Sequence, residues 1–328
     1  MEILILTPFI LGAWLANYSE QQTGARYLML VMLGLINLLL LVIGLLMVIA
    51  GQLLSQSAVP IPAEVPPIDF RSVGLAVLVT GFAAFIPLMP LARRLLARVI
   101  SIDPNSLVHT TALVYAVYLV GNTLASWPII NALAESEALA QQVLGQLRLT
   151  DAWLMGLFFA ATAVVGVGLY ARRDWHETWE RLKVRGVTGR QLAWTGGALV
   201  LLLAVEVGIS LAWQFLDPAG YERVGGLTDA FISSFLSPLG ALTVGLAAGI
   251  GEELLFRGAL QPRFGLLLTT LLFTFAHAQY GLSPALIGIF VVGYGLGLTR
   301  NRINTTAAIL VHAGFNFLQI IAATYLGT

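Results

Sequence analysis

Long apolar runs separated by short polar stretches are the dominant pattern of this chain. A membrane-spanning helix needs about 20 predominantly apolar residues, and nine segments meet or approach that length. These segments are residues 27–54, 73–91, 107–133, 152–171, 192–216, 231–255, 264–278, 284–298 and 305–326. The seventh and eighth are short for a full crossing. The pattern therefore predicts an all-α, polytopic transmembrane helical bundle of about nine spans.

The apolar stretch at residues 3–16 precedes the first of these segments and is too short to span. It lacks a basic region before it and a small-residue cleavage site after it, both of which a cleaved signal peptide requires. We expect it to lie in the membrane interface.

The basic residues are distributed unevenly between the two sides of such a bundle. If the segment before the first span is cytoplasmic and the chain then alternates, only Arg71, Arg148 and Arg223 fall outside, which leaves 14 of the 17 Lys and Arg residues inside. This bias follows the positive-inside rule. It predicts an integral cell membrane protein with its C-terminus outside.

The composition agrees with a lipid environment. Hydrophobic residues make up 58% of the chain and charged residues 10%, against about 25% charged in soluble proteins, and the mean hydropathy is +0.86. The net charge is zero, so nothing indicates nucleic-acid binding. Cysteine is absent, which excludes disulfides, a cysteine-based zinc site and a thiol nucleophile.

Two connections divide the chain. Residues 55–70 are proline-rich and acidic, which predicts an extended outer loop. Residues 172–190 are basic with Trp175 and Trp179 interleaved, which is typical of an amphipathic segment at the headgroup level. We take this second connection as a boundary between an N-terminal transmembrane region of four spans, residues 1–190, and a more polar C-terminal region, residues 191–328.

Ionisable residues inside spans are costly and usually functional, and they gather in the C-terminal region. Glu253 and Arg257 are four residues apart, so they share a helical face and can pair. Glu252 is rotated about 100° from Glu253 and is left free to face another partner. The Glu253–Arg257 pair alone is equally well explained as an ordinary ion pair at a helix end.

Three further polar residues lie in the segments that follow. His277 ends the seventh segment, and His312 and Asn316 share one face of the last. Two histidines, a free glutamate and an asparagine in neighbouring helices indicate a site rather than isolated hydrogen-bonding residues. By contrast, we interpret His109, Asn122 and Glu206 as structural, because no comparable group of polar residues accompanies them.

Two kinds of chemistry fit this set. Glu252 with His277 can deprotonate a water molecule, while His312 with Asn316 donates hydrogen bonds to the oxyanion of a tetrahedral intermediate. Alternatively, Glu252, His277 and His312 form a Zn²⁺ site with an open position for water. The chain lacks the H-E-x-x-H and G-x-S-x-G motifs of common metalloproteases and serine hydrolases.

The spacing Glu252-Glu253-x-x-x-Arg257, followed by Phe273-x-x-x-His277 and His312-x-x-x-Asn316, resembles the three motifs of the CPBP family. This family comprises the CAAX proteases, including the type II CAAX prenyl endopeptidases, and bacteriocin-processing enzymes. The resemblance covers about residues 236–326.

The resemblance implies an intramembrane endopeptidase that acts on a membrane-associated protein or peptide. Glu252 would be the base, His277 would help to activate water, His312 and Asn316 would stabilise the oxyanion, and Glu253 and Arg257 would support the site. Both a metalloprotease and a metal-free glutamate mechanism have been assigned to this family. The paired glutamates and the asparagine, a weak zinc ligand, favour the metal-free form here.

Two other functions use the same residues. A proton-coupled transporter would employ the intramembrane acids as a relay, and a non-catalytic scaffold or immunity protein would keep only the fold. The depth of the residues also requires explanation, because Glu252 is expected near the cytoplasmic end of its span and His277 deeper. We therefore expect tilted helices or a bend near Gly249 and Gly251, and a cavity that opens towards the cytoplasm.

Overall fold

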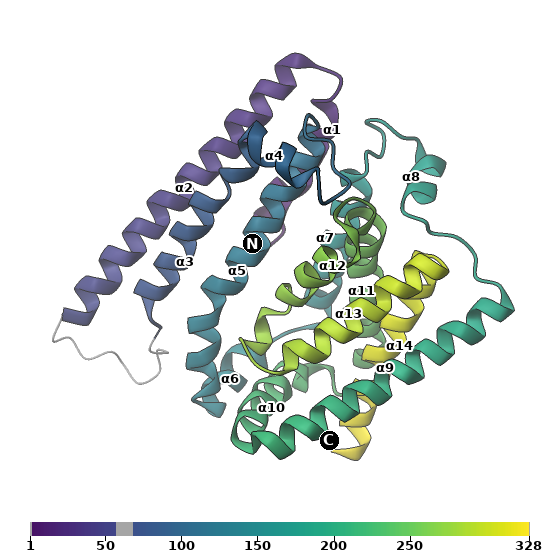
Figure 1. Cartoon of the computed structure of the whole chain (residues 1–328). Coiled ribbons are helices and arrows are strands. Elements are labelled where there is room, and N and C mark those ends of the chain that lie inside the picture. Colours follow the sequence, from purple (N-terminus) through teal and green to yellow (C-terminus); the bar gives the residue numbers. More distant parts are fainter. Residues whose placement is uncertain (1, 57–67, 328) are drawn as a thin grey trace.

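The computed structural model describes residues 2–56 and 68–327, and this part of the chain is all-helical (Figure 1). Most of the proline-rich connection at residues 55–70 lies outside the described residues, so its predicted extended conformation stays a prediction. The elements in chain order are α1 (Glu2–Tyr18), α2 (Thr23–Gln56), α3 (Phe70–Ala83), η1 (Ile86–Leu88), α4 (Pro90–Leu96), α5 (Leu107–Ala134), α6 (Glu137–Leu144), α7 (Leu149–Gly166), α8 (Trp175–Arg181), α9 (Gly189–Leu216), α10 (Pro218–Ile232), η2 (Ser233–Phe235), α11 (Pro238–Glu252), the π-helical η3 (Glu253–Leu260), α12 (Gln261–Phe275), η4 (Ala278–Tyr280), α13 (Ala285–Arg302) and α14 (Thr305–Leu326).

Seven helical segments of the described chain are long and apolar enough to cross a membrane, where the sequence predicted about nine. Six of them coincide with predicted spans. The remaining segment, Pro238–Phe275, joins the sixth and seventh predicted spans into one run of 38 residues. The eighth predicted span forms α13, which is helical but carries Arg300 and Arg302 in its last turn and is not one of the seven.

The Pro238–Phe275 run contains a reversal of the chain at Gly265. This glycine has a φ of +77°, which side-chain-bearing residues rarely adopt. Beyond it the chain returns along its own path, since the Phe273 ring lies 5.4 Å from the Phe256 ring and His277 reaches Glu252. The run therefore consists of two antiparallel passes, α11 with η3 and then α12.

Gly249 and Gly251, near which a bend was one of two expectations, allow close helix packing. A Cβ atom on Gly251 would lie 2.4 Å from the carbonyl oxygen of Gly156 in α7, and one on Gly249 would lie 3.0 Å from Ala313 in α14. These two glycines let α11 lie directly against both neighbours. Directly after them the helix changes to the π-helical η3, which extends it past the predicted end at residue 255.

The C-terminal helices enclose a compact apolar core around these elements. Phe256, Phe264, Phe273, Leu296 and Val311 are all buried and belong to one cluster. Between membrane-spanning helices such side chains stabilise the bundle mainly through van der Waals packing. This core fixes the positions of the polar side chains that lie between η3, α12, α13 and α14.

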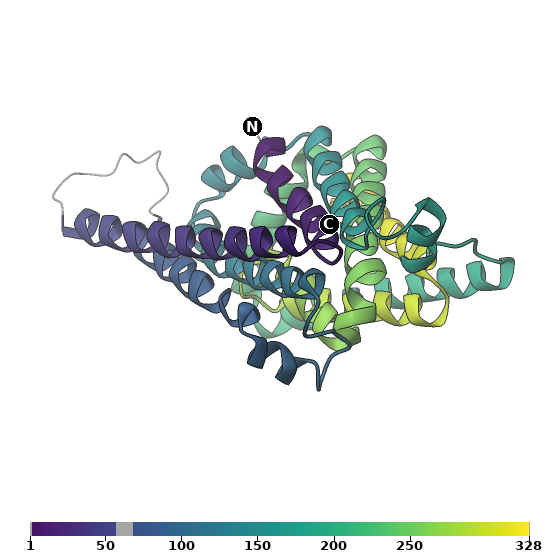
Figure 2. The same cartoon turned by 90° about the horizontal axis from the view of Figure 1, so that it is seen from above.

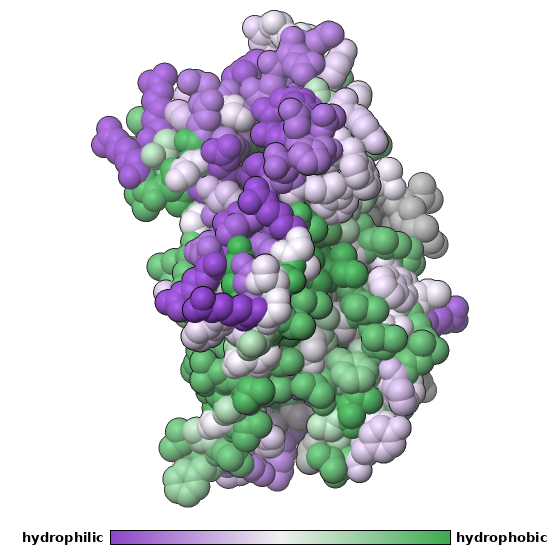
Figure 3. Space-filling view, turned by 90° about the vertical axis from the view of Figure 1, so that its right-hand side faces the viewer, coloured by the Kyte–Doolittle hydropathy of each residue, from purple (hydrophilic) through white to green (hydrophobic). Residues whose placement is uncertain are grey.

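The N-terminal helices form a layer against this core. Helix α1 packs against α5 and α7, with Ala13 and Ala16 buried, and α2 pairs with α3 while its far end extends past the rest of the bundle (Figure 2). Leucines on α2, such as Leu35 and Leu46, are exposed, as expected for a lipid-facing surface. Figure 3 shows a broad hydrophobic band with hydrophilic residues concentrated towards one end.

Candidate active site

The π-helical turn η3 begins at the pair of adjacent glutamates. Single π-turns within α-helices are uncommon and frequently occur at functional sites. The side chain of Glu253 is fully buried, whereas that of Glu252 keeps 17% of its surface exposed. The two carboxylates thus point into different surroundings, as their helical rotation predicted.

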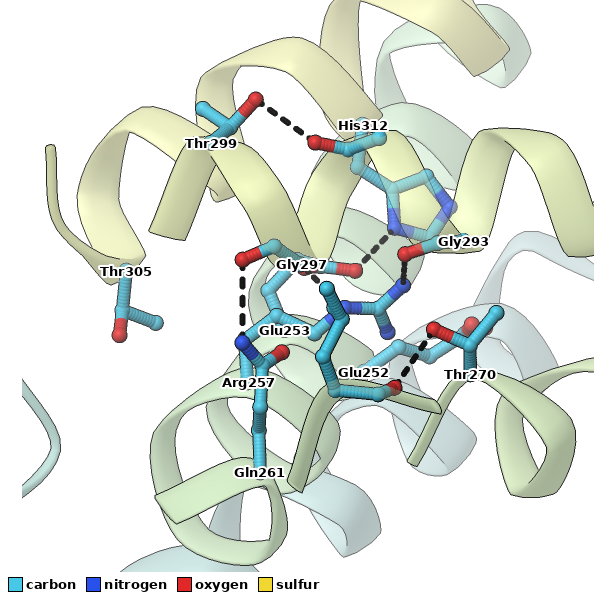
Figure 4. A network of polar contacts seen from close by, with 12 residues as sticks. Glu252, Glu253, Arg257, Gln261, Thr270, Gly293, Gly297, Thr299, Thr305 and His312 are labelled. Carbon is cyan, nitrogen blue, oxygen red and sulfur yellow. Dashed lines mark hydrogen bonds and ion pairs between the residues drawn. The ribbon is translucent and has the colours of Figure 1, made fainter. Parts of the chain in front are cut away.

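Glu253 lies at the centre of a buried polar network (Figure 4). The Nδ1–H group of His312 donates to Oε1 of Glu253 at 2.9 Å, and Nε of Arg257 lies 3.3 Å from Oε2. The predicted pairing of Glu253 with Arg257 is therefore present, and His312 joins it. Because one carboxylate serves both groups, Glu253 links η3 to α14.

Arg257 contacts a carboxylate, a backbone carbonyl and an aromatic ring, and its side chain is only 1% exposed. Its Nη2 donates to the carbonyl oxygen of Gly293 at 2.8 Å, and its guanidinium lies 4.2 Å from the centre of the Phe273 ring. A Cβ atom on Gly293 would lie 2.8 Å from that ring. A glycine at position 293 thus lets the guanidinium reach the backbone of α13.

Gln261, four residues after Arg257, also donates to a backbone carbonyl of α13. Its Nε2 donates to the carbonyl oxygen of Gly297 at 3.0 Å and to Oδ1 of Asn301 at 2.9 Å. The sequence reasoning missed Gln261. Its spacing of four residues from Arg257, matched by the same spacing between Gly293 and Gly297, was the available signal.

Glu252 and His277 face each other outside this network. Oε2 of Glu252 lies 3.9 Å from Nε2 of His277, beyond hydrogen-bond distance. The opposite ring nitrogen of His277, Nδ1–H, donates to the carbonyl oxygen of Phe273 at 2.8 Å. That bond fixes the ring and leaves the Nε2 lone pair directed towards Glu252.

Both side chains line a cavity of about 760 Å³. Within the described residues Oε2 of Glu252 is buried and accepts no hydrogen bond from the protein. The cavity walls come mainly from α1, α5, α7, η3 and α12, and most of them are aromatic or aliphatic. A carboxylate and an imidazole therefore share one largely apolar chamber.

His312 and Asn316 are not among the residues that line this cavity. His312 lies close by, since its ring centre is 5.8 Å from that of Phe273, which in turn is 4.7 Å from that of His277. Asn316 is partly buried one turn further along α14. The structure thus brings Glu252 and His277 together directly and connects His312 through Glu253 and Phe273.

The family assignment comes from a comparison with family models. The model described as type II CAAX prenyl endopeptidase Rce1-like matches residues 234–318. Residues 234–318 form an Rce1-like domain. A search of curated proteins and a search of solved structures each found no match to the chain.

The Rce1-like domain contains all six predicted site residues, whereas α1, α5 and α7 on the far wall of the cavity lie outside it. The chamber is consequently completed by the N-terminal part of the chain. The motif spacing therefore located the polar residues, but it gave no information on the shape of the cavity that they face.

Among the described residues no group of three His, Asp or Glu side chains stands close enough to hold a metal ion. Glu252 and His277 face each other, and Nδ1 of His312 is bound to the Glu253 carboxylate, which leaves its Nε2 as the third donor that a zinc site would need.

The three residues interpreted as structural, His109, Asn122 and Glu206, all lie outside residues 234–318. His109 accepts a hydrogen bond from the backbone N–H of Asp103 at 2.8 Å, and both His109 and Asn122 line the cavity. Glu206 lies against α13, where a Cβ atom on Gly288 would be 2.4 Å from its carboxylate. None of the three contacts the Glu253 network in the described residues.

Proposed function

We propose that this protein is an intramembrane endopeptidase that hydrolyses a peptide bond of a membrane-associated protein or peptide. Membership of the Rce1-like family supports this class of activity. The observation that carries the mechanism is the placement of Glu252 and His277, 3.9 Å apart, on the wall of one cavity. The substrate is an uncharged amide until it is attacked, so the site must supply a base and a means of stabilising the oxyanion.

A water molecule between the two side chains would have the required geometry. Both the carboxylate of Glu252 and the bare Nε2 of His277 are acceptors, so one water can donate a hydrogen to each and present its lone pair to the substrate carbonyl. The water oxygen bonds to the carbonyl carbon as Glu252 takes the proton. Glu252 then returns this proton to the amine as the C–N bond breaks.

His312 and Asn316 are the proposed donors to the oxyanion. With Nδ1–H of His312 bound to Glu253, Nε2 is the ring nitrogen left to face the oxyanion, and it donates there when both ring nitrogens carry a proton. The Asn316 amide would add a neutral donor from the same face of α14.

For the catalytic type we propose the metal-free form, because two facing acceptors, Glu252 and His277, are suited to holding a water and the amide of Asn316 is a weak zinc ligand. Cleavage should persist after chelation to substoichiometric metal content. Complete loss that added Zn²⁺ restores would contradict this assignment.

The decisive assay is peptide cleavage by purified protein in proteoliposomes. Glu252→Gln keeps the size of the side chain and removes the base, so the rate should fall at least 100-fold with the thermal unfolding temperature nearly unchanged. Glu206→Gln, a second glutamate inside the membrane, is the matched control and should keep full activity. Unchanged cleavage by Glu252→Gln would overturn the proposed role of Glu252 as the base. Loss of solute flux in both variants would instead favour a proton-coupled transporter.

We further propose that residues 1–190 are an N-terminal transmembrane region and residues 191–328 the protease core, with about nine passes, the cavity open to the cytoplasm and the C-terminus outside. Contacts among basic segments support one common cytoplasmic end. Arg181 donates to the carbonyl oxygen of Gly258, and Nζ of Lys183 donates to that of Arg300. The reversal at Gly265 supports counting α11 and α12 as separate passes.

A further inference from the structure

The amide of Asn122 lies in the cavity wall without a hydrogen bond to the protein. One face of α5 lines the cavity at each turn of the helix, through Val108, Ala112, Tyr115, Leu119 and Asn122. Asn122 is the last of these residues and is exposed, and no group within the described residues bonds to its side chain. An asparagine that ties two membrane helices together needs such a partner.

Two tyrosines that line the same cavity from α5 differ from Asn122 in this respect. The hydroxyl of Tyr115 donates to the carbonyl oxygen of Phe9 at 3.1 Å. The hydroxyl of Tyr118 donates to Oδ1 of Asn37 at 2.5 Å. Polar side chains inside membrane spans that face a cavity instead of a protein partner usually belong to a substrate or ion pathway, so a ligand that enters the cavity is the better explanation for Asn122.

Thr123 holds this amide beside the candidate chemistry. Its side chain is buried, and its hydroxyl donates to the carbonyl oxygen of Phe275 at the end of α12. His277 follows Phe275 by two residues, and α5 packs against both α12 and η4. Because Asn122 directly precedes Thr123, it lies level with the segment that carries His277.

A second amide lies on the other side of His277 along the chain. Gln279 in η4 follows His277 by two residues and lines the cavity. It forms no hydrogen bond through its side chain within the part of the chain that the structure describes. Each amide side chain carries both donors and an acceptor, so Asn122 and Gln279 present to the cavity two neutral groups of the kind that pair with a peptide group.

A substrate peptide needs such groups when it enters this cavity. Its backbone N–H and C=O groups exchange water for walls that are mostly aromatic and aliphatic, and each group left unpaired costs about 1–3 kcal/mol. Glu252 and His277 act on the scissile peptide group alone. Consecutive Cα atoms of a peptide are about 3.8 Å apart, so the peptide groups on either side of the scissile bond come close to the residues that flank His277.

We propose that Asn122 and Gln279 bind main-chain peptide groups of the substrate next to the scissile bond. Each amide donates to a substrate carbonyl oxygen and accepts from a substrate N–H group, so this contact does not depend on the side chains of the substrate. The ligand is an extended, uncharged peptide backbone. This inference rests on the proposed function, and it assigns the two residues to substrate binding and not to bond cleavage.

Binding is measured on the Glu252→Gln variant in proteoliposomes, so that cleavage does not interfere. The probe is a short fluorescent peptide of leucine and alanine, acetylated and amidated at its ends. Asn122→Leu and Gln279→Met keep the approximate size of each side chain and remove its amide. Each should weaken binding of the probe about tenfold. Affinity unchanged in both variants would overturn the proposal.

Ester analogues of the probe show whether the lost contact is to its backbone. In each analogue one peptide group is replaced by an ester, which removes an N–H donor and keeps the extended shape. The analogue that lacks the N–H bound by Asn122 should bind about tenfold more weakly. Asn122→Leu should then add no more than about twofold to that loss, because groups in contact are non-additive. Full additivity for every analogue would show that Asn122 does not touch the backbone and would overturn the proposal.

Asn131→Leu is the matched control. Asn131 lies on the same helix and is exposed, but it lines a separate groove between α3 and α5, so its substitution should leave the affinity for the probe unchanged. Since Asn122 has no protein partner to lose, Asn122→Leu should unfold within about 1–2 °C of Asn131→Leu. A much lower unfolding temperature for Asn122→Leu would assign Asn122 a structural role and contradict the proposal. Failure of the proposed function is recognised separately, by unchanged cleavage in Glu252→Gln.

Discussion

At the scale of single residues, the protein places two adjacent glutamates in different environments. Glu253 is enclosed by Arg257 and His312, and Glu252 faces His277 across a cavity. An isolated buried carboxylate is costly, so the positive charge of Arg257 and the hydrogen bond from His312 are what make the burial of Glu253 tolerable. The exposed fraction of Glu252 is what a group that must meet a substrate requires.

The network around Glu253 gives a stability prediction. Arg257→Ala removes the cation and leaves a buried carboxylate with His312 as its remaining partner, which should cost about 3–5 kcal/mol. Arg257→Lys keeps the charge but loses the planar contact with Phe273 and should cost less. Thermal unfolding in detergent micelles measures both.

The exposed Arg302 provides the control for that experiment. Arg302→Ala should leave the unfolding temperature within about 1–2 °C of the unsubstituted protein, since surface changes are usually within about 0.5 kcal/mol. If Arg257→Ala were as stable as Arg302→Ala, Glu253 would not depend on that arginine, and the network would have no structural role.

At the scale of helices, the site depends on contacts that allow backbones to approach closely. Gly251 of α11 lies against Gly156 of α7, and Gly293 of α13 lies against Arg257 and Phe273. The sequence indicated the small residues between spans but not which helices they join, because that depends on long-range packing. The π-helical η3 was likewise not predicted, whereas the reversal at Gly265 agrees with the two separate spans predicted at residues 231–255 and 264–278.

The contact between α7 and α11 gives a second prediction. A Cβ atom on Gly251 would lie 2.4 Å from a backbone oxygen, so Gly251→Ala should force the helices apart and cost about 1–3 kcal/mol. Gly208→Ala in α9, where a Cβ atom meets nothing within 4 Å, is the matched control and should not lower stability. Equal unfolding temperatures for the two variants would show that α7 and α11 separate without cost.

At the scale of the whole molecule, the sequence identified the helical membrane class and the segment that carries the chemistry. It identified the pairing of Glu253 with Arg257 because that contact is local, four residues along one helix. It did not identify the pairing of His312 with Glu253, or the cavity wall contributed by α1, α5 and α7, because both are set by distant parts of the chain. The Pro238–Phe275 run is one continuous helical segment by length, but the reversal at Gly265 divides it into two passes.

The orientation of the molecule can be checked on the native chain because it contains no cysteine. A single cysteine at the exposed position Tyr325 should react with a membrane-impermeant maleimide from outside intact cells, and one at the exposed Arg185 should react only after lysis. The reverse pattern would place the cavity on the outer side and contradict the proposed orientation.

The central claim is that Glu252 and His277 act together on one water molecule. A double-mutant cycle measures this directly, with peptide cleavage rates for Glu252→Gln, His277→Ala and the double variant in proteoliposomes. Residues that act as a unit are strongly non-additive, so the double variant should be no slower than the slower single variant, within about threefold. A double variant whose loss equals the product of the two single losses would show that the residues act independently and would contradict the account.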